Sequence, residues 1–263
     1  MAPSAASSDV AASPFLTAPV EANPIRAWTD WQGDDSLPGK MRSEGAVRAR
    51  LPVVKEMFAK AGVAFPPAEL GFVAFKAEKE LEVWAAEKVG GLAKKIATYA
   101  ICAASGDVGP KRYEGDYQVP EGYYVISYGW AESAFHLEMK VSYPNMVDRV
   151  LGPKTRPLGG EIMIHGSCGS IGCLAMSDER VEELWTMAKS LPGTDGALRA
   201  PQGAQIKVHL YPSRDMDALL RDASRARHHA FWQNLKEGKD RFDRERRFFP
   251  VTADWRGAYL FGE

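Results

Sequence analysis

The chain has 263 residues, of which 45% are hydrophobic and 25% are charged, a composition typical of a globular protein that can bury a sizeable core. Lys and Arg total 33 against 34 Asp and Glu, so the formal net charge is -1. This balance excludes the strongly basic field that draws a protein to nucleic acid or to an anionic membrane. No uninterrupted apolar run approaches the roughly 20 residues of a membrane helix. We therefore expect no membrane span and no nucleic-acid partner.

The N-terminal segment is rich in Ala, Ser and Pro over residues 1–24. It lacks the positively charged start and the continuous apolar stretch of a signal peptide. We interpret residues 1–45 as a flexible lead-in. Such a segment fits a mature exported protein whose signal has been removed, and it fits a cytoplasmic protein equally well.

The first regular elements are expected after this lead-in. A helix is predicted from Pro52 to Ala61, because proline is tolerated in a first helical turn and Gly62 suits the position after a helix end. Two short strands, 72–75 and 81–84, flank a charged tip and predict a hairpin. Residues 96–102 continue the strand pattern.

The middle of the chain contains a long segment, residues 105–122, that is rich in Gly and Pro and has no periodicity. Such a stretch inside a compact domain is more often a functional loop than a simple connector. Beyond it the pattern predicts strands rich in β-branched and aromatic residues, a helix with Asp178 as its N-cap, a further strand and a long charged helix. Their expected ranges are 123–128, 135–143, 161–165, 178–188, 205–211 and 215–235.

The chemistry is expected in the segment from His165 to Cys173. An apolar strand ends at His165, and a loop containing three glycines leads to Cys173. Nucleophilic cysteine chemistry needs a thiolate, a nearby base and backbone donors for an oxyanion. The eight-residue separation lets a tight loop return the thiol to the imidazole, and the N–H groups of Gly172 and Cys173 are candidate donors.

Two other interpretations compete with this one. In the first, His165 ends a strand and Cys173 is a small buried hydrophobe, since free cysteines are usually buried and inert. In the second, His165, Cys168 and Cys173, with Cys102, supply four zinc ligands, although the spacing lacks a C-x-x-C knuckle. The three cysteines are too few for a disulfide scaffold and leave at least one that cannot pair within the chain. We expect neither a metal nor a cofactor.

Several motifs in order resemble the YkuD-type L,D-transpeptidase catalytic domain, in which a His-Gly on a strand precedes Ser-x-Gly-Cys before a helix. Here these are His165-Gly166 and the run from Ser170 to Cys173. Further motifs are similar to the YafK-like branch of that family. They are Ser105-Gly106, Gly109-Pro110-Lys111, Glu114-Gly115-Asp116, Pro120-Glu121-Gly122, Tyr143-Pro144-Asn145 with Asp148, and residues 231–236.

This resemblance implies an α+β fold: a β-rich catalytic domain with mixed sheets or a sandwich and flanking helices. We place that domain at residues 46–212 and expect residues 213–263 to form a helical extension packed on it. The resemblance implies that Cys173 attacks the L-centre carbonyl of diaminopimelate in a peptidoglycan stem peptide and forms a thioester. His165 would act as base and then acid, and the chain would be periplasmic or otherwise exported.

The remaining site residues are expected around this pair. Gly166, Ser170 and Gly172 would shape the oxyanion and substrate-binding loop. His136, Tyr143 and Asn145 would line the substrate cleft, because they lie at or just past a strand end. Cys168 is either a second thiol that tunes the site or a simple loop residue.

The product depends on what accepts the acyl group: a second stem amine, a protein lysine or water. Two departures from the common family pattern bear on this choice. Ile171 replaces a His, and Ala175 stands where an Arg often follows, which removes a bidentate carboxylate partner. A hydrolytic amidase that releases a peptidoglycan-bound lipoprotein, and a catalytically silent peptidoglycan-binding module, therefore remain alternatives.

Overall fold

The computed structural model describes residues 38–200 and 204–263, so most of the predicted lead-in lies outside the described residues. The first helix, α1, runs from Gly39 to Ala61 and ends at Gly62, which adopts the left-handed conformation with φ 62°. The predicted helix end is confirmed. The predicted start at Pro52 is wrong, because Pro52 lies inside the helix. The lead-in assigned to residues 1–45 is also too long, since residues 39–45 are helical.

Tertiary contacts explain why α1 begins so early. Ser43 accepts a hydrogen bond of 2.8 Å from the indole of Trp185, and Arg42 donates to the backbone oxygens of Ser133 and His136 at 2.8 Å. Arg50 forms an ion pair of 2.7 Å with Glu182. These partners lie about 90 or more positions away in the sequence. Local sequence signals for a helix start contribute little stability compared with these tertiary contacts. The helix therefore begins upstream of Pro52, where its first turns can form these contacts.

The central element is an eight-stranded mixed sheet with the order β3-β2-β1-β8-β4-β5-β6-β7. The β1–β8 and β6–β7 pairs are parallel, and the other pairs are antiparallel. This architecture confirms the predicted α+β fold class. The strands are β1 Glu69–Phe75, β2 Glu80–Ala86, β3 Lys94–Ala100, β4 Gly122–Ser133, β5 His136–Val141, β6 Met163–His165, β7 Leu174–Ala175 and β8 Lys207–Tyr211.

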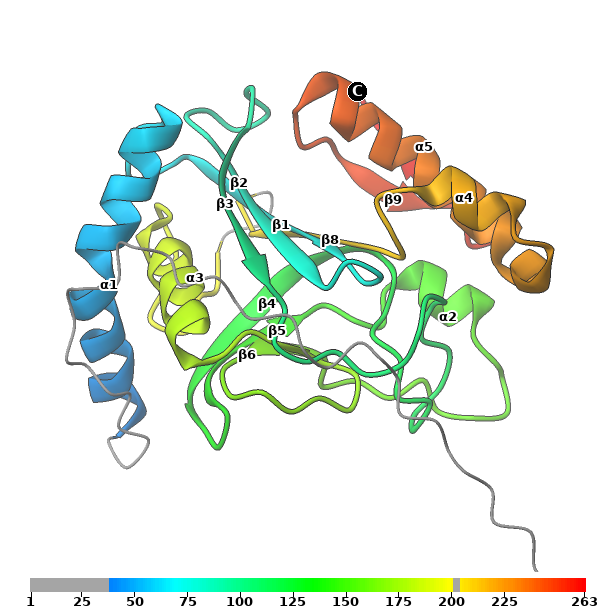
Figure 1. Cartoon of the computed structure of the whole chain (residues 1–263), viewed down its shortest axis with the longest axis horizontal. Helices are drawn as coiled ribbons and strands as arrows, with labels where there is room; N and C mark the ends of the chain where they lie inside the picture. Colours follow the sequence, from blue (N-terminus) through cyan, green and yellow to red (C-terminus); the bar gives the residue numbers. More distant parts are fainter. Residues whose placement is uncertain (1–37, 201–203) are drawn as a thin grey trace, which may run out of the picture. The chain divides into compact units, whose positions relative to one another are not determined.

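The main core lies between one face of this sheet and two helices. Helix α3 runs from Asp178 to Ser190 and packs beside α1 (Figure 1). Along β5 the side chains alternate, so that Leu137, Met139 and Val141 are buried in this core. The intervening Glu138 and Lys140 therefore point to the other face of the sheet. That second face carries the candidate site.

The C-terminal segment packs on β1, β2 and β8 through a second apolar cluster, which includes Trp84, Tyr211, Trp232 and Phe242. It consists of α4 Met216–Arg221, a 3-10 helix η1 Ala223–His228, α5 His229–Glu245 and a hairpin of β9 Val251–Ala253 with β10 Tyr259–Phe261. The predicted single helix over 215–235 is wrong. Asp222 interrupts it, because its carboxylate accepts a hydrogen bond of 3.0 Å from the Ser224 N–H and starts a new turn. Within residues 38–200 and 204–263, no helix is long and apolar enough to cross a bilayer.

Candidate active site

His165 ends β6, and Cys173 immediately precedes β7, the neighbouring strand of the sheet. The parallel β6–β7 register pairs Ile164 with Leu174, which places Cys173 beside Met163. The Met163 N–H lies 3.4 Å from the Cys173 Sγ. Ile164 and Leu174 are buried in the main core, so the residues before and after them face the opposite side. The alternation therefore places the thiol and the imidazole on the same side of the sheet, away from α1 and α3.

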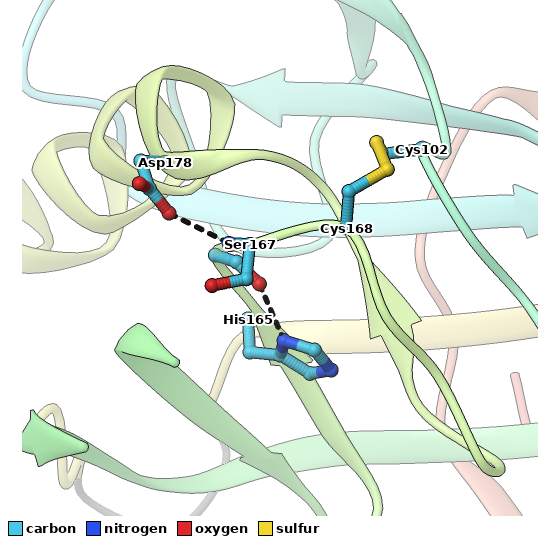
Figure 2. Close-up of a disulfide and its surroundings, with 6 residues drawn as sticks. Cys102, His165, Ser167, Cys168 and Asp178 are labelled. Atoms are coloured by element: carbon cyan, nitrogen blue, oxygen red, sulfur yellow. Dashed lines mark hydrogen bonds between the residues drawn. A yellow bond between two sulfur atoms is a disulfide. The ribbon is translucent and has the colours of Figure 1, made fainter. Parts of the chain in front are cut away.

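The His165 ring is held in one orientation by the backbone. Its Nδ1 lies 2.6 Å from the carbonyl oxygen of Gly166, and Figure 2 shows this contact as a dashed line. A carbonyl oxygen only accepts, so Nδ1 carries the proton and Nε2 of the neutral ring has a free lone pair. The ring is 3% exposed and packs against Phe135 at 5.0 Å between centroids. This is the tautomer that a general base at Nε2 requires.

The Cys173 thiol is half-buried and not joined to another cysteine. Burial raises the pKa of this thiol above its ordinary value, and the hydrogen bond from the Met163 N–H opposes that shift. The thiol also lies 3.5 Å from the backbone oxygen of Glu161, to which it donates. At neutral pH the thiol is therefore mostly protonated, and its use as a nucleophile depends on a base that takes the proton.

The loop before Cys173 is organised by Ser170. Its hydroxyl donates to the Cys173 backbone oxygen at 2.7 Å and accepts from the Gly172 N–H at 3.2 Å. Gly172 has φ 135°, which side chains rarely tolerate, and a Cβ there would lie 3.3 Å from the Gln118 oxygen. Because the Gly172 N–H is already bonded within the loop, its assignment as an oxyanion donor is weakened, whereas Ser170 acts by shaping the loop.

Gly166 is required by close packing beside the site. A Cβ at this position would lie 2.5 Å from the Asp178 carboxylate and 2.8 Å from the His136 Cβ. Asp178 is the first residue of α3 and not its N-cap, which is Ser177. The Asp178 carboxylate instead accepts a hydrogen bond of 2.6 Å from the Ser167 N–H (Figure 2). The start of α3 therefore holds the loop that follows His165.

A disulfide joins Cys102, which follows β3, to Cys168 in the same loop, with 5.4 Å between their Cα atoms (Figure 2). The prediction of Cys168 as a second thiol or a simple loop residue is therefore wrong. The zinc alternative loses two of its ligands, because disulfide sulfurs are not thiolates. The pairing was missed because the residues are 66 positions apart and only the fold brings them together.

We expect the disulfide to stabilise the protein and to tether the catalytic loop. Replacing Cys102 and Cys168 together by serine should lower the free energy of unfolding by about 2–4 kcal/mol, through the larger conformational freedom of the unfolded chain. The thermal midpoint should then fall by roughly 10 °C in a scanning calorimetry experiment. The matched control is Cys173→Ser, which leaves the bridge intact. Equal midpoints for the double variant and the parent would rule out this role.

Three predicted cleft residues have structural contacts instead. His136 is 0% exposed and its Nε2 lies 2.9 Å from Glu182 in α3, so the prediction that it lines the cleft is wrong. Tyr143 is buried and donates to the backbone oxygen of Leu158 at 3.1 Å. Asn145 caps helix α2, Met146–Leu151, where it accepts from the Asp148 N–H at 3.0 Å. These contacts account for the three side chains without a substrate.

The aperiodic loop before β4 is held against the site by a buried ion pair. Lys76 donates to Glu121 at 3.1 Å and to the backbone oxygens of Gly109 and Val119 at 2.7 and 2.8 Å. Glu121 also accepts from Trp232 at 2.8 Å. The loop reaches the segment between His165 and Cys173 at Ser105, whose hydroxyl lies 3.5 Å from that of Ser170. The C-terminal segment thus contributes to the position of this loop.

Two residues on the same face were missed by sequence reasoning. The β5–β6 register places Glu138 opposite His165 and Lys140 opposite Met163. Glu138 is buried, and its charge adds to the rise in the Cys173 pKa, as does that of Glu161. The alternation of apolar and charged residues in β5 is the signal that could have found them. It did not show which side of the sheet carried the chemistry.

The fold and this site define a member of a known class. Residues 73–208 match the L,D-transpeptidase catalytic domain, YkuD, and the chain belongs to that family. It is 33% identical over 188 residues to the Escherichia coli (strain K12) protein named "Putative L,D-transpeptidase YafK", which is 71% of each chain. The protein of the same name from Escherichia coli O157:H7 matches to the same extent.

Three solved structures, of two proteins, are also similar. The helical cell shape determining protein Pgp2 of Campylobacter jejuni has a TM-score of 0.42 and 18% identity, over 82% of this chain and 81% of that chain. Bd1075 of Bdellovibrio bacteriovorus has a TM-score of 0.38 and 17% identity, over 67% and 57%. A mutant form of Pgp2 has a TM-score of 0.41 and 18% identity, over 68% of this chain and 58% of that chain.

Proposed function

We propose that this chain is a cysteine acyl enzyme that acts on peptidoglycan stem peptides. The observation that carries the proposal is that Cys173, immediately before β7, and His165, at the end of the neighbouring strand β6, face the same side of the sheet, with His165 Nδ1 held by the Gly166 oxygen. Membership of the L,D-transpeptidase family supports the substrate class and the attack at the L-centre carbonyl of diaminopimelate.

The proposed reaction has two acyl-transfer steps. His165 Nε2 takes the thiol proton while the Cys173 sulfur bonds to the carbonyl carbon, and a backbone N–H at Cys173 stabilises the oxyanion. The carbon–nitrogen bond then breaks, and the imidazolium returns the proton to the leaving amine. In the second step an amine or water attacks the thioester carbonyl while His165 takes its proton. The carbon–sulfur bond then breaks, and the imidazolium returns the proton to the Cys173 sulfur.

A hydrolytic outcome is the second candidate, and Ala175 favours it. The register pairs Ala175 with His165, and this alanine is fully buried. A guanidinium at that position would offer a planar partner to a carboxylate, and an alanine cannot. In this alternative, water accepts the acyl group and the enzyme releases a peptidoglycan-bound lipoprotein.

The proposed location is periplasmic or otherwise exported. The Cys102–Cys168 disulfide supports it, because structural disulfides persist in oxidising compartments and are rare in the cytosol. The peptidoglycan substrate is found on the same side of the membrane.

Mass spectrometry of reaction products tests the function. The protein would be incubated with tetrapeptide muropeptides and, separately, with lipoprotein-bearing sacculi, each beside a Cys173→Ala control. We expect a change that requires Cys173: dimers for a transpeptidase, shortened stems for a carboxypeptidase, or free lipoprotein for an amidase. If neither substrate changes and both still bind, the chain is a silent binding module and the proposal is wrong.

A further inference from the structure

The candidate site contains a cation whose position suits a substrate carboxylate. Lys140 lies on β5 opposite Met163, and the Met163 N–H contacts the Cys173 sulfur. Lys140 and Cys173 therefore flank the same residue on one face of the sheet. Two strand spacings put their backbones about 10 Å apart. A lysine side chain on this face can extend part of the way across that distance.

Glu161 connects this cation to the nucleophile. Its side chain accepts a hydrogen bond from the Lys140 ammonium, and its backbone oxygen accepts from the Cys173 thiol at 3.5 Å. The ring of Tyr128, opposite Lys140 on β4, lies 5.4 Å from the same ammonium. The ammonium is thus held between the Tyr128 ring and the side chain of Glu161, the residue whose backbone oxygen contacts the thiol.

The Lys140–Glu161 pair can be exchanged for a substrate carboxylate. The Glu161 side chain is 70% exposed and that of Lys140 is 21% exposed. An ion pair with so exposed a partner contributes little to stability, about 0–1 kcal/mol, and water readily replaces it. A bound carboxylate at the same place would keep the charge of Lys140 neutralised while Glu161 turns to solvent.

The other charged residues near Cys173 are not suited to bind a substrate carboxylate. Lys111 is 5% exposed and already donates to Asp116 at 2.7 Å and to the Tyr113 oxygen at 2.9 Å. Glu138, on the His165 side of the same strand, repels a carboxylate. A substrate that carries a carboxylate is therefore oriented with that group toward Lys140 and away from His165.

We propose that Lys140 binds a carboxylate of the stem-peptide substrate and takes over part of the work of the absent arginine at Ala175. This inference rests on the proposed function. Two carboxylates share the required chemistry: that of the D-centre of diaminopimelate and that at the C-terminus of the tetrapeptide stem. The first lies at the far end of the diaminopimelate side chain, and the second lies on the residue that follows the L-centre carbonyl that Cys173 attacks.

Steady-state kinetics with three substrates tests the proposal: a tetrapeptide muropeptide, its D-centre amide and its C-terminal amide. Lys140→Gln should raise KM for the free acid roughly tenfold or more, with kcat little changed, since a charged hydrogen bond is lost. Lys140→Arg is the matched control and should restore most of the binding. The amide for which Lys140→Gln and the parent no longer differ identifies the carboxylate.

Binding measurements separate this inference from the proposed function. Calorimetric titration of the tetrapeptide into Cys173→Ala, with and without Lys140→Gln, needs no turnover. A roughly tenfold weaker Kd with Lys140→Gln supports the carboxylate site even if no turnover is seen. Equal Kd and KM values with and without Lys140→Gln, or no binding at all, would overturn it. Cys173-dependent turnover alongside equal values would leave the proposed function standing.

Discussion

Replacing Cys173 by alanine is expected to reduce product formation by a factor on the order of 10⁴ or more, because the covalent step has no substitute nucleophile. The only other sulfhydryl candidates, Cys102 and Cys168, are joined to each other in the disulfide. Intact-protein mass spectrometry should show an acyl adduct on the parent and none on the variant.

The control for this experiment is the thermal stability of the Cys173→Ala variant, which shows whether the variant is folded. Cys173 is half-buried, and among residues 38–200 and 204–263 its sulfur makes weak hydrogen bonds with the Met163 N–H and the Glu161 oxygen. The alanine variant should therefore keep the unfolding midpoint of the parent within a few degrees. A folded Cys173→Ala protein that turns over substrate as fast as the parent would exclude the thioester mechanism.

Replacing His165 by alanine should lower kcat/KM at neutral pH by about 10²–10⁴, the usual contribution of a general base. The pH dependence should change as well. Burial places the Cys173 pKa above its ordinary value of 9.0, so without a base the rate follows the small thiolate fraction. The His165→Ala rate should then rise about tenfold per pH unit until that pKa is reached, whereas the parent is active near neutral pH.

His228 provides a matched control for this prediction. It lies in η1, in the C-terminal segment, and takes no part in the pairing of β6 with β7. His228→Ala should keep the activity and the pH profile of the parent. Parallel pH profiles for His165→Ala and the parent, differing only in height, would argue that His165 does not take the thiol proton.

Much of the strand pattern could be predicted from the sequence alone, including a strand that ends at His165 and a loop that leads from it to Cys173. These features depend on residues that are close together in the sequence. The β1–β2 hairpin follows from two apolar strands around a charged tip, and the end of α1 follows from Gly62, which accepts the left-handed conformation. The neighbouring positions of β6 and β7 also arise locally, since one short loop connects His165 to Cys173.

The tertiary structure decided everything that depends on partners far along the chain. It joined Cys102 to Cys168 across 66 positions, and it buried His136 against Glu182 in α3. It also decided which face of β5 is buried in the core, and so placed Glu138 and Lys140 on the same face of the sheet as His165. Side-chain alternation reveals that a strand has two faces, but only packing against α1 and α3 determines which face is buried in the core and which is left for a substrate.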